Sequence, residues 1–141
     1  MRLLICAGGT GGGVYPALAV HHALTDKREN VQTLWVGGEG GMEEELVNRA
    51  GIPFRSVPAA GVHGVGLFAL PGNLAKLARG VFASRRILRE FQPDVLFFTG
   101  GYVAGPAVIA ALLRGLPVVA MEPNARPGVT NLRLGRRVAR T

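Results

Sequence analysis

A glycine-rich segment near the amino terminus has the residue types best suited to binding chemistry. Residues 7–13 contain five glycines and Thr10; they follow an apolar run at residues 3–6 and precede an apolar segment that contains Pro16. An apolar run without alternation is typical of a buried parallel strand, and proline is favoured in a first helical turn. Strand, glycine loop and helix in this order present backbone amides at a positive helix end, which predicts a site for an anionic or polar group.

The spacing of these glycines excludes two common nucleotide-binding motifs. The dinucleotide pattern GxGxxG needs glycine where Val14 or Pro16 stands, and a P-loop needs Lys-Ser or Lys-Thr after its last glycine. Glu39, after the second predicted strand, is the one feature in favour of a dehydrogenase. A turn that only packs tightly stays an alternative for this segment.

Strand and helix patterns alternate along the chain and predict the fold. Strands are expected at residues 3–6, 31–36, 54–57, 95–98, 117–120 and 138–139. Helices are expected after the glycine loop from Pro16, at 42–50 with three glutamates in the first turn, in a basic stretch that ends near Phe91, and at 104–113 and 128–134. The alternation predicts an α/β fold in one domain, residues 1–141: a doubly wound, Rossmann-like parallel sheet with helices on both faces and strand order 3-2-1-4-5-6.

This topology brings two glycine loops together. The first and fourth strands are neighbours whose crossovers leave in opposite directions, so loops 8–13 and 99–102 are expected to open into one crevice. The loop after the fifth strand, with Glu122 and Asn124, is expected beside them.

Composition limits the class of protein. The 141 residues are 48% hydrophobic with a mean hydropathy of +0.27, which suits a single domain with a substantial core. One cysteine, Cys6, excludes a disulfide within the chain and is expected to be a small buried hydrophobe. No signal peptide and no uncharged run near the ~18 to 20 residues of a membrane span is expected.

Charge is distributed unevenly around a net value of +7. Residues 1–75 hold five basic and six acidic residues, whereas residues 76–141 hold eleven and three. The first basic cluster accompanies an apolar stripe, which suits either an anionic membrane surface or a helix that covers the sheet. Nucleic acid is not expected, because the nine aromatic residues lie mostly in apolar runs. The proposed membrane patch is Leu67, Phe68, Leu74, Lys76, Leu77, Arg79, Phe82, Arg85 and Arg86.

The histidines and acidic residues show no metal-ligand spacing, so neither a metal nor another cofactor is expected. His21 and His22 lie more than one turn into the first helix and are expected to have surface or packing roles. His63 lies in the glycine-broken stretch 61–66, which is expected to be mobile.

Six motifs together resemble the MurG family of inverting glycosyltransferases, and the resemblance extends over essentially the whole chain. They are GGTGG followed by VYPALAV, GME at 41–43, PDV at 93–95, GGYVAGP at 100–106, GLPVV at 115–119, and the segment 122–131. The resemblance implies one half of a GT-B fold, the amino-terminal acceptor-binding domain, with the carboxy-terminal donor-binding domain expected to be absent from this chain. It also implies transfer of N-acetylglucosamine from UDP-GlcNAc to lipid-linked muramyl-pentapeptide pyrophosphate at the cytoplasmic face of a bacterial membrane.

The resemblance assigns roles to individual positions. Thr10, Gly11, Gly12 and Gly13 match the loop that faces the acceptor pyrophosphate, and Gly100, Gly101 and Tyr102 match a second such loop. Glu122 and Asn124 match polar positions near the transfer point. In the expected chemistry a base takes the proton of the muramyl 4-hydroxyl while fixed dipoles stabilise the departing UDP.

Three positions depart from the family pattern. Gly13 stands where the family usually has histidine, and Met121 and Pro123 replace two further polar residues. Glu122 or His63 is the hypothetical replacement base; unimpaired turnover by Glu122→Gln and His63→Ala in a reconstituted enzyme excludes that hypothesis. The alternative is a non-catalytic, membrane-recruiting subunit of a split two-chain glycosyltransferase, which obtains UDP-GlcNAc binding from its partner chain.

Overall fold

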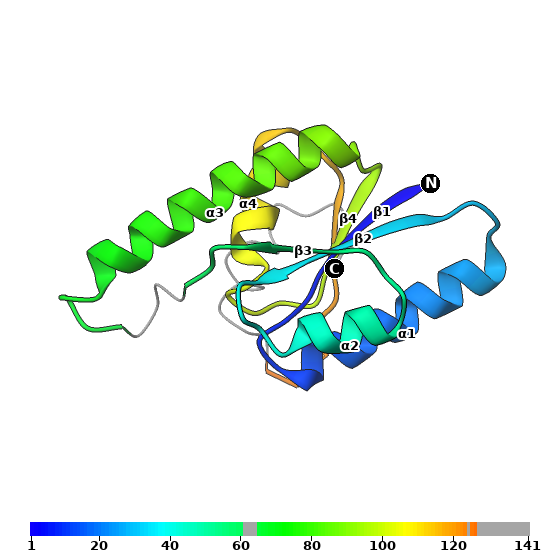
Figure 1. The fold of residues 1–141 in the computed structure, drawn as a ribbon, viewed down its shortest axis with the longest axis horizontal. Coiled ribbons are helices and arrows are strands. Elements are labelled where there is room, and N and C mark those ends of the chain that lie inside the picture. Colours follow the sequence, from blue (N-terminus) through cyan, green and yellow to red (C-terminus); the bar gives the residue numbers. More distant parts are fainter. Residues whose placement is uncertain (61–64, 124, 127–141) are drawn as a thin grey trace.

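The computed structural model describes residues 1–60, 65–123 and 125–126. It contains one parallel sheet in the order β3-β2-β1-β4-β5 (Figure 1). The predicted α/β fold and the order of its first five strands are confirmed, whereas the strand and helix expected at 138–139 and 128–134 lie outside the described residues. The strands are β1 (Arg2–Cys6), β2 (Gln32–Gly38), β3 (Phe54–Val57), β4 (Val95–Phe98) and β5 (Val118–Ala120).

Four helices cover the two faces of the sheet (Figure 1). Alternation along β1 divides the core, because Leu3 and Ile5 face one side while Leu4 and Cys6 face the other. The first pair of helices packs on the side of Leu3, and the second pair packs on the side of Leu4. The first pair is α1 (Gly11–Lys27) and α2 (Glu43–Arg49); the second is α3 (Leu70–Phe91) and α4 (Gly105–Leu113).

The first helix begins earlier than the sequence predicts. Helix α1 starts at Gly11, so Pro16 lies inside it and the expectation that proline opens the helix is wrong. Glycine disfavours helix, so the sequence predicts a loop at residues 11–13. In the structure the amides of Gly13 and Val14 form the first helical bonds, to the Thr10 carbonyl oxygen, and a tertiary contact supports this turn because the Gly13 carbonyl accepts a hydrogen bond from another loop.

Two buried side chains secure the strand that leads into the glycine loop. The indole Nε1 of Trp35, in β2, donates to the carbonyl oxygen of Ala7 at 2.8 Å, immediately beyond the end of β1. Cys6 is fully buried, and that burial raises the pKa of its thiol far above the ordinary value. The expectation that Cys6 is a buried hydrophobe is confirmed.

Helix α3 has two different halves. Gly80, Ser84 and Leu88 are its buried residues, all from the middle of the helix onward, whereas Leu74 and Phe82 are exposed. The predicted apolar stripe therefore covers the core in the second half of the helix, while the first half extends beyond the sheet (Figure 1). A Cβ atom at Gly80 would overlap the Pro58 carbonyl oxygen and lie 3.0 Å from the Pro106 side chain, so glycine permits α3 to approach α4.

We expect Gly80→Ala to lower the free energy of unfolding by about 2 kcal/mol, because overpacking outweighs the helix propensity that alanine contributes. Gly72→Ala is the matched control, since the same substitution in the same helix meets no atom within 4 Å. That control should be neutral or stabilising by up to ~1 kcal/mol. Urea denaturation measures both; equal stability of the two variants would contradict the packing argument.

Candidate functional site

The two predicted glycine loops meet at the carboxyl edge of the sheet. The hydroxyl of Thr99, directly after β4, donates to the carbonyl oxygen of Gly13 in α1 at 3.0 Å. A Cβ atom on Gly101 would lie 3.3 Å from the carbonyl oxygen of Gly8, so the loop backbones are also close. Gly9 and Gly101 have φ values of 83° and 82°, a region that side chains with a Cβ rarely occupy. The two loops that the topology predicts to face each other are therefore in direct contact.

The first turn of α1 presents donors to this edge. Thr10 is the N-cap residue and is exposed, as is Gly12. The Thr10 carbonyl oxygen accepts hydrogen bonds from the amides of Gly13 and Val14. The amides of Gly11 and Gly12 come before this turn and have no acceptor within the helix. With no acidic residue in the first turn, this helix end suits an anionic group.

Two exposed tyrosines flank the loop. Tyr102 lies beside Gly9, since a Cβ atom there would be 4.0 Å from the Tyr102 ring. Tyr15 lies beside Gly11, where the corresponding distance to its ring is 3.3 Å. The sequence predicts Tyr102 as a site residue but not Tyr15, because Tyr15 shares a helix face with Gly11 only through the start of α1 at Gly11.

A buried carboxylate lies against the loop from the core side. Glu43, the first residue of α2, is fully buried. Its Oε1 accepts a hydrogen bond from the amide of Gly38 at 2.8 Å, and its Oε2 accepts one from the amide of Gly9 at 3.3 Å. The sequence predicts Glu43 only as a favourable charge in a first helical turn, because the pattern does not distinguish it from Glu44 and Glu45.

The candidate bases have different outcomes. Glu122 is partly buried and follows Met121, whose amide donates to the Phe98 carbonyl oxygen at 2.9 Å, so it lies at the same edge as the loop after β4. His63 lies outside the described residues, as does Asn124. The role of Glu122 as a base therefore stays a prediction. Its position beside the loop after β4 is the expected one.

The other histidines lie far from this edge along the sheet. His21 Nδ1 is 3.1 Å from the hydroxyl of Thr33, near the amino-terminal end of β2. Partial burial lowers the pKa of His21, and the neighbouring His22 lowers it further. The expectation of surface or packing roles agrees with this placement.

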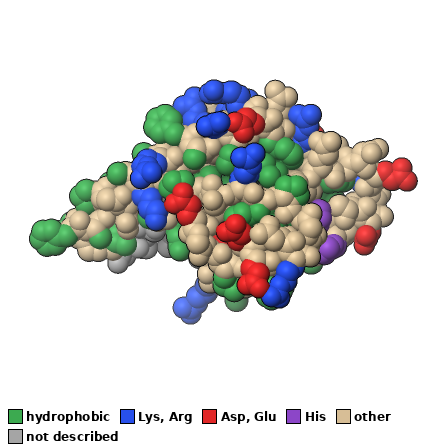
Figure 2. All heavy atoms as spheres, in the orientation of Figure 1, with side chains coloured by type: hydrophobic (Ala, Val, Ile, Leu, Met, Phe, Trp, Pro, Cys, Tyr) green, Lys and Arg blue, Asp and Glu red, His purple; other side chains and the backbone are tan. Residues whose placement is uncertain are grey.

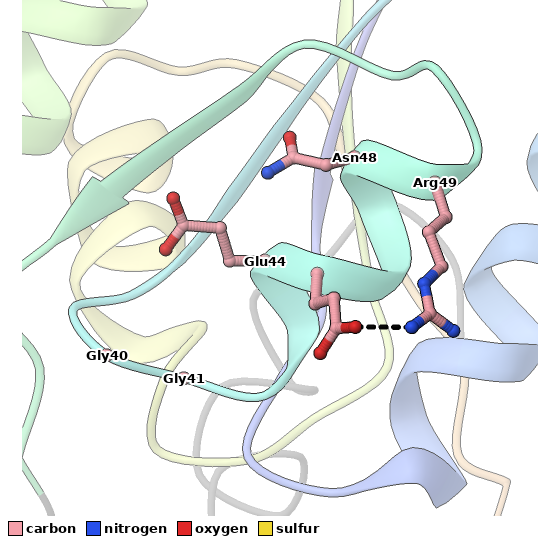
Figure 3. A pocket seen from close by; sticks show the side chains of 6 residues that line it. Gly40, Gly41, Glu44, Asn48 and Arg49 are labelled. Carbon is pink, nitrogen blue, oxygen red and sulfur yellow. Dashed lines mark hydrogen bonds and ion pairs between the residues drawn. The ribbon is translucent and has the colours of Figure 1, made fainter.

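A shallow hollow on the outer side of α2 contains none of the predicted site residues. Figure 3 shows Glu44 and Asn48 along it, and the neighbouring Glu45 paired with Arg49. Its volume is about 580 Å³ and its lining is Gly40, Gly41, Glu44, Glu45, Asn48 and Arg49. Two carboxylates make it a poor site for the anionic group that the glycine loops suit.

Residues 1–60, 65–123 and 125–126 hold neither a metal-ligand cluster nor a membrane-spanning helix. Within these ranges, no three His, Cys, Asp or Glu side chains are grouped as metal ligands. No helix in this part of the chain has both the length and the apolar character needed to cross a bilayer.

The fold and its paired loops define the class: one Rossmann-like half of a GT-B protein. The chain belongs to glycosyltransferase family 28, whose N-terminal domain matches residues 3–141. The resemblance to MurG is likewise confirmed. The crystal structure of Acinetobacter baumannii MurG superposes with a TM-score of 0.84 at 36% identity, over 98% of this chain and 40% of that one.

Two curated relatives share one name, that of an N-acetylglucosamine transferase. The UDP-N-acetylglucosamine–N-acetylmuramyl-(pentapeptide) pyrophosphoryl-undecaprenol N-acetylglucosamine transferase of Desulforudis audaxviator is 46% identical over 144 residues, 100% of this chain and 38% of the relative. The Bacillus subtilis protein of that name is 42% identical over 131 residues, 93% of this chain and 36% of the relative. The chain thus spans less than two fifths of these relatives. Both are named as the transferase itself, so they do not favour the alternative of a non-catalytic subunit.

A more distant structure shows the fold alone. The UDP-GlcNAc 2-epimerase from Methanocaldococcus jannaschii has a TM-score of 0.67 at 13% identity, over 99% of this chain and 38% of that one. The same architecture therefore occurs with different chemistry, and function has to be argued from the loops.

We expect Thr99→Val to lower the free energy of unfolding by about 1 kcal/mol, because it removes the hydroxyl that joins the two loops. Thr99→Ser retains the donor and should recover most of that loss. Thermal and urea unfolding measure the difference. Destabilisation by serine as large as that by valine would contradict the hydrogen-bond argument, because serine retains the donor.

Proposed function

We propose that this chain is the acceptor-binding half of a MurG-like inverting glycosyltransferase of peptidoglycan synthesis. The acceptor is a lipid-linked muramyl-pentapeptide pyrophosphate, and the transferred group is N-acetylglucosamine from UDP-GlcNAc. The proposal rests on one observation above the others: the hydrogen bond from Thr99 to Gly13 joins the glycine loops after β1 and β4 into one donor-lined edge. Membership of glycosyltransferase family 28 supports the substrate class.

The acceptor pyrophosphate is proposed to lie at the first turn of α1. Amides at Gly11 and Gly12, the hydroxyl of Thr10 and the positive helix end are complementary to its negative charge. Gly100, Gly101 and Tyr102 form the facing loop, which the structure places after β4. Together these groups orient the muramyl hydroxyl toward the donor sugar.

The donor is proposed to bind mainly through a part of the protein beyond the aligned length, in the same chain or in a partner chain. The relatives named above are more than twice as long as the segment they share with this chain. Glu122 is the proposed base among the described residues, because it lies beside the loop after β4. Its role is to accept the proton of the attacking hydroxyl.

We expect the chain to bind a short-chain lipid-linked muramyl pyrophosphate analogue, and Gly12→Ala to weaken that binding about tenfold, because a methyl group then covers the exposed donor turn. A Cβ atom at Gly12 has room within the fold, with its nearest neighbour 3.8 Å away at the Thr10 hydroxyl. Calorimetric titration measures the affinity, and Gly72→Ala serves as the matched substitution away from the loops. Absence of binding by the unsubstituted chain would refute the proposed function.

We also propose that the segment before α3 and the exposed face of that helix contact the anionic inner face of a bacterial membrane. Leu67, Phe68 and Phe82 are strongly exposed, at 85%, 103% and 70%. In the space-filling view, basic side chains gather over α3, whereas acidic side chains lie mainly over the other elements (Figure 2). Exposed apolar groups beside Lys and Arg are the combination that anionic bilayer surfaces attract.

The remaining patch residues add to this surface to different degrees. Lys76, Arg79 and Arg85 are exposed, whereas Leu77 is partly buried. Arg86 is paired with Glu90, with 2.8 Å between Nε and Oε1, so its charge is partly balanced. The positive charge offered to a membrane therefore comes mainly from the first three.

Replacement of Leu67 and Phe68 by serine should weaken binding to vesicles of anionic phospholipid about tenfold, because both side chains lose their apolar contact with the bilayer. Leu113→Ser, at an exposed position of α4 outside the patch, is the control. Co-sedimentation with anionic and zwitterionic vesicles measures the effect. Equal binding of the double variant and the unsubstituted chain would contradict the assignment of this surface.

A further inference from the structure

Glu43 is a buried carboxylate that connects two loops at the site edge. One oxygen accepts from Gly9, in the loop between β1 and α1, and the other accepts from Gly38, at the end of β2. Burial of a carboxyl group without hydrogen bonds is costly, so both contacts are needed by the fold. Its position as the first residue of α2 adds the favourable field of that helix.

Three glycines leave the space that this carboxylate occupies. A Cβ atom at Gly8 or at Gly41 would overlap the carboxyl group, and one at Gly37 would lie 2.8 Å from Oε1. These glycines come from the loop after β1, from β2 and from the loop before α2. Three backbone segments thus pack closely against the Glu43 carboxyl group. A glutamate that only contributes charge to the start of a helix does not need such close packing.

The two contacts differ in strength and in what they control. The bond to Gly38 is short, at 2.8 Å, and stays within the β2 to α2 segment, five residues from Glu43. The bond to Gly9 is longer, at 3.3 Å, and reaches across 34 residues to the loop that precedes α1. Gly9 adjoins Thr10, the N-cap residue of α1, so its orientation influences the direction of the donor turn.

We propose that Glu43 is a positioning residue: its carboxylate holds Gly9 so that Thr10 and the first amides of α1 face the acceptor pyrophosphate. This role rests on the proposed function, because the pyrophosphate is the ligand for which the turn is held. Glu43 itself is buried and acts through the loop. The Thr99 hydroxyl restrains the same turn from the side of β4, at Gly13.

Glu43→Gln separates the two contacts. The carboxamide keeps one acceptor oxygen but places an NH₂ donor at its other position. The oxygen is expected to retain the shorter bond to Gly38, so the NH₂ group then faces the amide of Gly9, donor against donor. Amide hydrogen exchange in the ¹⁵N-labelled chain should therefore be about tenfold faster or more at Gly9, while Gly38 stays protected.

The affinity for the short-chain acceptor analogue should fall about tenfold in Glu43→Gln, measured calorimetrically at a temperature where the variant is fully folded by circular dichroism. Glu44→Gln is the matched control, because this exposed neighbour undergoes the same change of charge and group. It should leave both exchange at Gly9 and affinity unchanged.

A second variant tests the same role without removing the carboxylate. Gly41→Ala places a methyl group against the carboxyl group of Glu43 and should displace it from Gly9. The same local signature, fast exchange at Gly9 with weaker binding, is expected. This variant also decides the matter if Glu43→Gln does not fold.

The outcomes separate this inference from the proposed function. If the unsubstituted chain does not bind the analogue, the proposed function fails, and exchange at Gly9 still shows whether Glu43 holds the loop. If the chain binds but Glu43→Gln binds equally well, the positioning role is overturned and the proposed function stands. Unchanged exchange at Gly9 in both variants overturns the inference on its own.

Discussion

The candidate site depends on the hydrogen bonds that a buried carboxylate, Glu43, must form with backbone amides. Glu43 obtains them from Gly9 and Gly38, and so connects the backbone beyond β1 with the end of β2. A carboxylate in the interior is tolerated only when such donors are oriented toward it, and the surrounding glycines leave space for it. The conformation of the first glycine loop is therefore linked to the core, although the loop itself lies at the surface.

The second constraint is topological. Strands β1 and β4 are adjacent but their crossovers run in opposite directions, so the helices separate and the loops beyond both strands face a common space. The hydroxyl of Thr99 converts this proximity into a hydrogen bond, with the carbonyl oxygen of Gly13 as acceptor. One loop is thus held by Glu43 of α2 and by Thr99, directly after β4. The glycines of this loop are conformationally flexible, but hydrogen bonds from both sides restrain their backbone.

Much of the architecture was predictable because its causes are local. The continuous apolar runs of β1 and β4 and the β-branched residues of β5 predict buried parallel strands, and the right-handed crossover rule determines their order. The start of α1 was not predictable, because three glycines disfavour helix and the contact that supports the turn comes from Thr99, 86 residues away from Gly13. The course of α3 also required the structure, since its apolar stripe does not reveal which half meets α4.

The sequence by itself determined the family, the layered fold and the two glycine loops, because each is recorded in residue type and short-range spacing. The tertiary structure decided which side chains serve those loops. Glu43, Glu44 and Glu45 are equivalent in sequence, yet only Glu43 of the three is buried with its oxygens on loop amides. Tyr15 likewise becomes a neighbour of the loop because α1 begins at Gly11. The physical reason is that burial and hydrogen-bond partners depend on segments far apart in the chain, whose approach no local pattern encodes.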